Sequence, residues 1–142
     1  MDGVDAKEVW GRVTSWDGVN HELAPILRMT HPARFRSLSD IPANGHCHFI
    51  SVILFMGAIP IDLHRLAFRA FDYGHSFRER STNLLMRSWR HDRSVRSVSD
   101  GVVIRDACEF EPRLLVPGIL LLPILRQLFK RRHKRLGRFF HI

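Results

Sequence analysis

Apolar residues near the start of the chain recur at helical spacing. They fall close to one face of a helix: Val9, Trp10, Val13 and Trp16. Asp5 and Glu8 have the spacing of a capping box, and their acidic side chains lie where the helix dipole favours negative charge. The pattern therefore predicts an amphipathic helix over Asp5–Trp16, ended by Asp17-Gly18.

The following segments carry strand and loop patterns. Ile26–Thr30 is typical of a short strand, and the polar, proline-bearing stretch Ala33–Asn44 is typical of a loop. Phe49–Met56 is almost continuously apolar, and its β-branched residues favour a strand, although a buried helix has the same continuity. Asp62–Phe71 fits a helix and a strand equally well, so its conformation stays open.

Alternation becomes regular in the second half of the chain. It predicts strands over Phe77–Asn83, Leu85–Val98 and Val102–Glu111, with a tight hairpin at Ser99-Asp100-Gly101. Within the two long strands, two sets of side chains each share a face: Trp89, His91, Arg93 and Val95, and then Val102, Ile104, Asp106, Cys108 and Phe110.

The chain closes with a long amphipathic helix over Leu121–Phe139, and Pro123 fits its first turn. A narrow stripe along it contains one polar residue, His133, among Leu122, Leu125, Phe129, Leu136 and Phe140. Because the approach and first turn are apolar on every side, we expect that end to be covered more deeply than the basic end.

These elements predict one α+β domain over residues 1–142. A short N-terminal helix is followed by a curved antiparallel β-sheet, packed on the long C-terminal helix in a helix-grip arrangement. A strongly curved sheet facing a helix leaves an apolar hollow between them, which is a usual place for a ligand.

The charge balance restricts the partners. Against 14 acidic residues the chain has 22 Lys and Arg, a net charge of +8. Many arginines are spread through alternating segments, so we expect no nucleic-acid partner. The densest charge is Lys130–Arg135 with Arg138; it complements the helix dipole as a solvated helix end. Its alternative role is a peripheral contact with an anionic membrane, with Phe139 and Phe140 as anchors.

Several segments resemble the START-like superfamily, also called Bet v 1-like, SRPBCC-type or polyketide cyclase/dehydrase and lipid-transport domains. The segments that carry the resemblance are Asp5–Trp10 with Trp16-Asp17-Gly18, Phe77–Ser81, Met86–Arg93, Asp100-Gly101, Arg105-Asp106 and Arg131–Leu136. Members of this superfamily begin with a strand before the first helix. Here only Met1–Val4 precede the helix, so we expect the first strand to be shortened or missing.

The resemblance implies that the domain binds a hydrophobic small molecule, such as a lipid, polyketide or quinone, in a cavity between sheet and C-terminal helix. The residues expected to line it are Trp89, Leu122, Leu125, Phe129, His133 and Leu136. An enzymatic alternative is a cyclase or dehydratase in the same cavity. Without a full first strand, Val102–Glu111 presents an open edge, from which we expect a homodimer.

Catalytic candidates for the enzymatic alternative are Glu79, His91 and Asp106. Pointing into a cavity they could do acid–base work, because burial shifts the pKa of such groups. The structural alternative, which we favour from sequence alone, is cross-strand charge pairing on the solvent face with Arg93 and Arg105. Likewise, His133 is either a ligand contact or a satisfied helix histidine.

Other chemistry finds little support in the sequence. His46-Cys47-His48 has no second ligand pair at zinc-finger spacing, so we expect no metal and no other cofactor. Glycine-rich phosphate loops and nucleophile elbows are absent from the sequence. Cys47 and Cys108 fit buried free thiols in a reducing compartment. The acidic start and the short apolar runs predict a cytoplasmic protein without a membrane span.

Overall fold

The computed structural model describes residues 5–113 and 118–140. Two short helices, α1 (Ala6–Thr14) and α2 (Trp16–Leu23), come first, and a long helix, α3 (Gly118–Phe139), comes last. Between them lie a short 3-10 helix (Leu38–Asp40) and the strands β1 (Leu27–Met29), β2 (Phe49–Phe55), β3 (Ile59–Leu66), β4 (Phe68–Asp72), β5 (Ser76–Ser81), β6 (Met86–Val98) and β7 (Gly101–Pro112).

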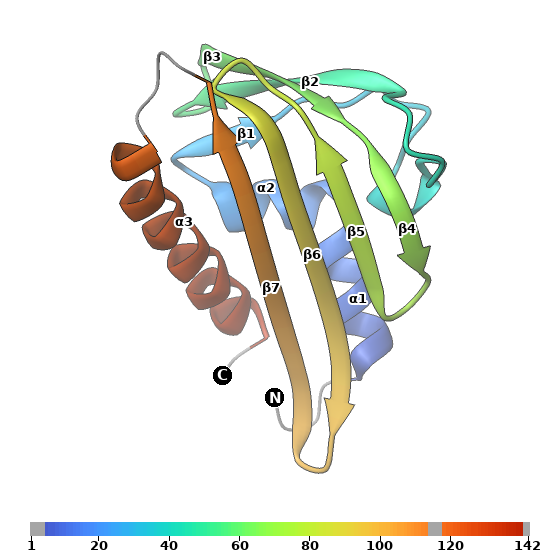
Figure 1. Ribbon diagram of the computed structural model, residues 1–142. Helices are drawn as coiled ribbons and strands as arrows, with labels where there is room; N and C mark the ends of the chain where they lie inside the picture. The colour runs from blue at the N-terminus through green and yellow to red at the C-terminus, as the bar shows by residue number, and fades with distance from the viewer. Residues whose placement is uncertain (1–4, 114–117, 141–142) are drawn as a thin grey trace.

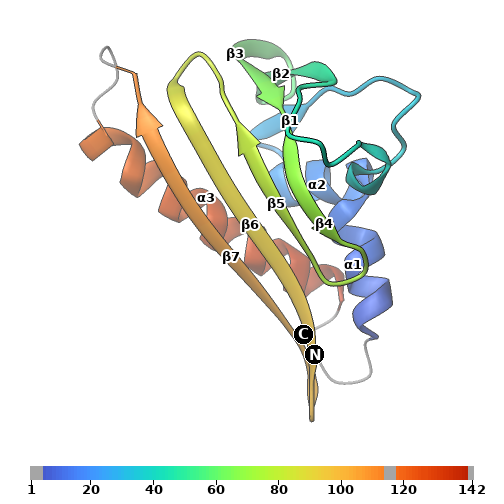
Figure 2. The ribbon, with the colours of Figure 1, turned by 45° about the vertical axis from the view of Figure 1, so that its right-hand side comes forward.

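The strands pair antiparallel in the orders β1-β2-β3 and β4-β5-β6-β7. Only Ala67 separates β3 from β4, and its carbonyl accepts a 2.8 Å hydrogen bond from the Arg80 backbone N–H. The two sheets therefore form one bent surface, and α1, α2 and α3 lie on one side of it (Figures 1 and 2). This architecture confirms the predicted α+β helix-grip fold.

The N-terminal helix differs from the prediction. Ser15 ends α1 and also caps α2, because its hydroxyl accepts a hydrogen bond from the Gly18 backbone N–H at 3.0 Å. The prediction that Asp17-Gly18 ends the helix is therefore wrong. A Cβ on Gly18 would lie 1.7 Å from the Arg12 carbonyl oxygen, so close approach of the two helices accounts for this glycine.

The open segment Asp62–Phe71 is strand: it contributes to β3 and β4, with the bend at Ala67. Within β3, Asp62, His64 and Leu66 are buried while the residues between them are exposed, as alternation requires. The predicted hairpin is also present, since Val98 pairs with Gly101 across a two-residue turn.

The core lies where α1 and α2 pack on the inner face of β4, β5 and β6, and it is rich in aromatic contacts. Trp10, Phe68 and Phe77 are buried together, with Trp10 and Phe77 centroids 6.3 Å apart and Phe68 and Phe77 centroids 5.3 Å apart. From α3, Leu136 joins this cluster. The helix is thus fixed to the core through its C-terminal half.

The expectation that the apolar start of α3 is the more deeply covered end is wrong for the described side chains. Leu122 is 40% exposed and Ile124 is 63% exposed. By contrast, Arg132 and Leu136 are buried. The basic half is held because its arginines reach α2: Arg135 Nε donates to the His21 carbonyl at 2.6 Å.

The predicted loss of the first strand concerns the edge of the sheet at β7. β7 is the terminal strand in the order β4-β5-β6-β7. Met1–Val4, where a short first strand would lie, fall outside the described residues. The predicted homodimer through β7 stays a prediction.

Candidate functional site

The inner face of the sheet carries ionisable side chains that the protein interior usually excludes. Glu79 on β5, His91 on β6 and Asp106 on β7 all point inward, and their side chains are buried. The interpretation that they pair on the solvent face is therefore wrong: cross-strand pairing does occur, but beneath the helices. Arg105, the other proposed partner, is on the exposed outer face.

Arg93 is the central cation of this buried group. Its guanidinium donates to both oxygens of Glu22 from α2, at 3.0 and 2.8 Å, and to both oxygens of Asp106, at 2.8 and 3.0 Å. Arg132 of α3 approaches the same Glu22, with Nε 3.4 Å from Oε1. Two helices and two strands are thus joined through charges shielded from water, where ion pairs are least screened.

His91 lies between two carboxylates. Its Nε2 is 2.7 Å from Asp106 Oδ1, and its Nδ1 is 3.7 Å from Glu79 Oε1. Burial by itself raises the pKa of Asp106, but hydrogen bonds from His133 and His91 and the charge of Arg93 outweigh it and hold this pKa far below its ordinary value. Asp106 therefore stays ionised, and its oxygens orient the imidazoles of His91 and His133.

Glu79 continues the chain of contacts towards β3. Its Oε2 accepts hydrogen bonds from His64 Nε2 and from the Ser81 hydroxyl, both at 2.6 Å. Although burial raises the pKa of Glu79, the interactions with His64 and then His91 hold it well below the ordinary value. On the far side of His64, Asn83 Nδ2 lies 3.1 Å from Nδ1.

His133 is the end of this chain that reaches solvent. Its Nε2 is 2.5 Å from Asp106 Oδ2, yet its side chain is 42% exposed. A carboxylate that holds one imidazole nitrogen leaves the other nitrogen available to an incoming molecule. The Asp106–His133 pair can therefore donate or accept a hydrogen bond at the boundary between buried network and solvent.

Apolar side chains lie beside the Asp106–His133 pair, towards the N-terminal end of β6. The Trp89 ring stacks on Phe129 of α3 at a centroid distance of 6.3 Å, and Phe129 also meets His91 at 5.2 Å. Leu125 and Phe129 are half-buried. Of the other residues predicted to line a cavity, Leu122 is exposed and Leu136 belongs to the closed core. Trp89, Leu125, Phe129 and His133 each keep part of their surface exposed.

Some members of the buried network have no signal in the sequence. Glu22 lies within a helical pattern and is paired with a residue 71 positions later. The sequence did not establish on which face of the sheet the side chains of His64 and Asn83 lie. Alternation along β3 could have placed His64 inside once that segment was assigned as strand.

The remaining sequence candidates stay apart from this network. His48 Nε2 contacts Asn44 Oδ1 at 3.1 Å, and the Cys47 thiol donates to the Phe49 carbonyl at 3.0 Å. Across the residues that the structure describes, no three His, Cys, Asp or Glu side chains are grouped to hold a metal ion. Nor does any helix in that part of the chain combine the length and apolar character needed to cross a membrane.

A family model described as "Domain of unknown function (DUF8410)" matches residues 3–140. Among solved structures, protein CV1439 from Chromobacterium violaceum is similar with a TM-score of 0.70 and 11% identity, over 97% of this chain and 91% of that one. DynU16, from the dynemicin biosynthetic locus, has a TM-score of 0.64 and 13% identity, over 99% of this chain and 44% of its own. This chain thus spans less than half of DynU16. Among curated proteins nothing matches.

Proposed function

The chain belongs to the DUF8410 family, and we propose that it binds a hydrophobic small molecule between the inner face of its sheet and α3. The observation that carries the proposal is the half-buried apolar wall formed by Trp89, Leu125 and Phe129, beside the buried carboxylates. Trp89 and Phe129 stack there next to His133, which is bonded to Asp106. An apolar wall with a few convergent polar groups is the usual composition of a small-molecule site.

Two further points support this proposal. The resemblance to the START-like superfamily implies binding in this region, and the fold neighbours are consistent with that assignment. DynU16 comes from a biosynthetic locus, which fits a product or intermediate of small-molecule synthesis as the kind of ligand. In the proposed complex the apolar part of the ligand contacts Leu125 and Phe129, and a polar group of the ligand meets His133.

Native mass spectrometry of the protein purified from cells tests the proposal. A retained apolar molecule should appear as a defined mass increment and should be lost in Leu125→Asp, which places a carboxylate in the proposed wall. Ile124→Asp is the matched control, because the neighbouring Ile124 is 63% exposed and the charge change is the same. Titration with a hydrophobic fluorescent probe should show at least a tenfold weaker affinity for Leu125→Asp alone.

If both variants bind equally, or if the wild-type protein neither retains an apolar molecule nor binds the probe, the proposed site is wrong. The probe titration guards against ligand loss during purification. Circular dichroism of each variant checks that both remain folded.

An enzyme acting in the same place is a second candidate, favoured by the convergence of Glu79, His91 and Asp106. Since both carboxylates are held as anions, the imidazole of His133 would exchange protons with the substrate and Asp106 would position it. The test is to incubate the protein with the molecule identified by mass spectrometry and follow its mass or spectrum. Conversion that is lost in Asp106→Asn and kept in Arg96→Gln supports an enzyme; an unchanged molecule supports binding alone.

A further inference from the structure

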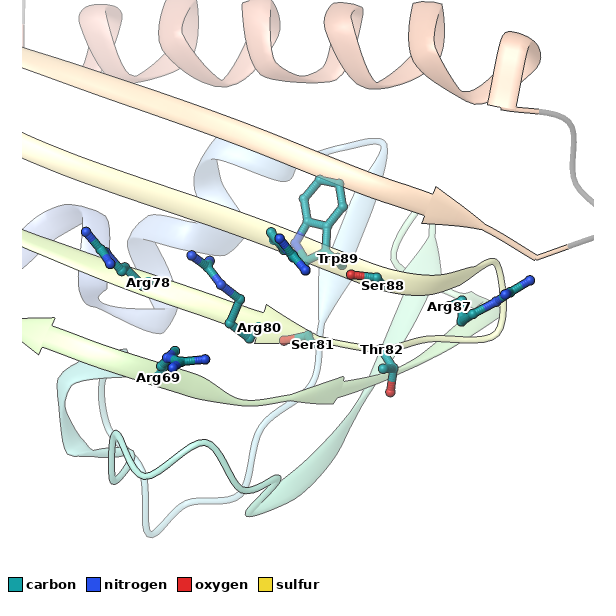
Figure 3. A pocket seen from close by; sticks show the side chains of 9 residues that line it. Arg69, Arg78, Arg80, Ser81, Thr82, Arg87, Ser88 and Trp89 are labelled. Carbon is teal, nitrogen blue, oxygen red and sulfur yellow. The ribbon is translucent and has the colours of Figure 1, made fainter.

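A hollow lies on the opposite, outer face of the sheet, across β4, β5 and β6 (Figure 3). Its volume is about 540 Å³. No carboxylate is among its lining residues. Most of them are arginines: Arg69, Arg78, Arg80, Arg87 and Arg90. We call this feature the arginine hollow. Trp89 is also among its lining residues, but the Trp89 ring packs against Phe129 of α3 on the inner face, so the hollow and the proposed apolar site lie on opposite faces of β6.

The strand register concentrates positive charge in the arginine hollow. Arg80 on β5 lies directly opposite Arg90 on β6, and Arg78 shares the outer face two residues away. Like charges directly opposite one another in an antiparallel pair are destabilising. The register also places Asp92 opposite Arg78 and Glu109 opposite Arg90, so opposite charges compensate the repulsion between Arg80 and Arg90 only in part.

β4 adds a further cation through an irregularity. The register between β4 and β5 shifts between Phe68 and Ala70, so Arg69 is an extra residue beside Arg78. Such a bulge bends the strand and redirects a side chain. In Figure 3, Arg69, Arg78 and Arg80 come from adjacent strands and border the same hollow.

The carboxylates around the hollow neutralise only part of this charge. Arg80 is held by Asp92 and by the Glu79 carbonyl, both at 2.7 Å, so its guanidinium is preoriented. Weaker, exposed pairs join Arg87 to Glu111 at 3.5 Å and Arg90 to Glu109 at 3.7 Å.

Arg69 and Arg78 form no ion pair within residues 5–113 and 118–140, where the salt bridges of the structure are described. Thr82 and Ser88 add hydroxyl groups to the lining. The hollow therefore offers fixed and free guanidinium groups together with neutral hydrogen-bonding groups.

We propose that the arginine hollow binds a small molecule bearing two or more phosphate-type oxyanions, such as a diphosphate group. Guanidinium groups bind such oxyanions through paired N–H donors, and several on adjacent strands can hold two neighbouring anionic groups. A ligand anion would also relieve the repulsion between Arg80 and Arg90. The volume leaves room for an organic part attached to the anion.

Isothermal titration calorimetry with inorganic pyrophosphate tests the inference. Wild-type protein should bind it saturably, and the double variant Arg69→Gln/Arg78→Gln should bind at least tenfold more weakly. Arg96→Gln/Arg105→Gln is the matched control: it removes the same charge from exposed positions on the outer face of β6 and β7, outside the hollow. This control should bind like the wild type.

Equal weakening in both double variants would overturn the site, since net charge alone would then explain binding. Because Arg69 and Arg78 are exposed, both variants should keep the wild-type melting temperature, which a thermal scan verifies. A variant that melts early is replaced by Arg78→Gln alone against Arg96→Gln.

Vesicles containing phosphatidylglycerol, compared with neutral vesicles, separate a free ligand from a lipid headgroup. Pyrophosphate binding without vesicle binding indicates a free oxyanionic molecule. Vesicle binding that pyrophosphate displaces indicates the same hollow occupied by a headgroup phosphate. Vesicle binding with no saturable pyrophosphate binding overturns the proposal in favour of a diffuse membrane contact.

Discussion

Arg93 on β6 and Glu22 on α2 form a two-pronged ion pair in which neither side chain has any exposed surface. The pair joins a helix to the sheet across 71 positions of sequence. Because Arg93 also binds Asp106, one guanidinium pairs with carboxylates from two elements. Such a pair is costly to leave incomplete, since removal of one partner leaves a buried charge without its counterion.

Glu22→Ala should lower the free energy of unfolding by about 3–5 kcal/mol, because Arg93 and Arg132 lose their shared carboxylate. Urea denaturation measures the change. The control, Glu8→Ala on the exposed face of α1, should cost less than about 1 kcal/mol. Similar losses in the two variants would contradict a structural role for the pair.

His64 should hold its proton on Nε2, where Glu79 accepts it, and should accept a hydrogen bond at Nδ1. The Asn83 side-chain oxygen accepts from the Met86 backbone N–H at 2.7 Å, so its amide nitrogen faces His64 Nδ1 at 3.1 Å. An amide nitrogen only donates, and Nδ1 must therefore accept. Nitrogen-15 NMR should find Nε2 protonated and Nδ1 unprotonated. A protonated Nδ1 in the wild type would refute this arrangement, and Asn83→Asp should create one.

Stability should fall in acid because of Glu79 and Asp106. Their partners outweigh the effect of burial and place each pKa below the ordinary values of 4.5 and 3.8. As the pH falls through about 5 to 3, these carboxyls take up protons in the unfolded chain but not in the folded protein. Proton binding therefore stabilises the unfolded state relative to the folded state. The free energy of unfolding, measured by urea denaturation at each pH, should decrease across this range.

The variant Asp106→Asn tests whether these carboxyls cause the loss of stability in acid. This variant should be less stable near neutral pH, and its stability should depend less steeply on pH below about 5 because one of the two carboxyls is gone. An unchanged slope would assign the acid sensitivity to other groups.

His133→Phe should cost stability. The hydrogen bond to Asp106 Oδ2 is removed, although His91 and Arg93 still satisfy this carboxylate, so we expect a loss of about 1 kcal/mol. The same variant should bind the hydrophobic fluorescent probe differently if His133 borders the site. Lys134→Phe, at the exposed neighbouring position, should change neither quantity.

Two glycines near the N-terminus should respond in opposite directions to alanine. At Gly18 a Cβ would lie 1.7 Å from the Arg12 carbonyl oxygen, and the resulting overpacking should cost about 3 kcal/mol. Gly11 has open space around the position of a Cβ, and alanine there should stabilise α1 by about 0.5–1 kcal/mol. Thermal and urea unfolding of the two variants measure both effects.

The long strands show how much of the site could be predicted. Period-two alternation correctly placed Trp89, His91 and Arg93 on one face, and Asp106 on the matching face of β7. Which face turns towards the helices could not be deduced, because His, Arg and Asp are ordinarily solvent-facing residues. Their burial follows from partners such as Glu22, which only the docking of α2 supplies.

For this protein, the sequence by itself determined the strands β5, β6 and β7, the hairpin at Asp100-Gly101 and the amphipathic character of α3, because these depend on local spacing and turn chemistry. Tertiary structure alone decided that Arg132 and Leu136 in the basic half of α3 are buried while Leu122 and Ile124 are exposed, with Arg132 drawn to Glu22. It also decided that Arg80 and Arg90 stand opposite each other. Both outcomes depend on register and on contacts between distant segments, which local periodicity does not encode.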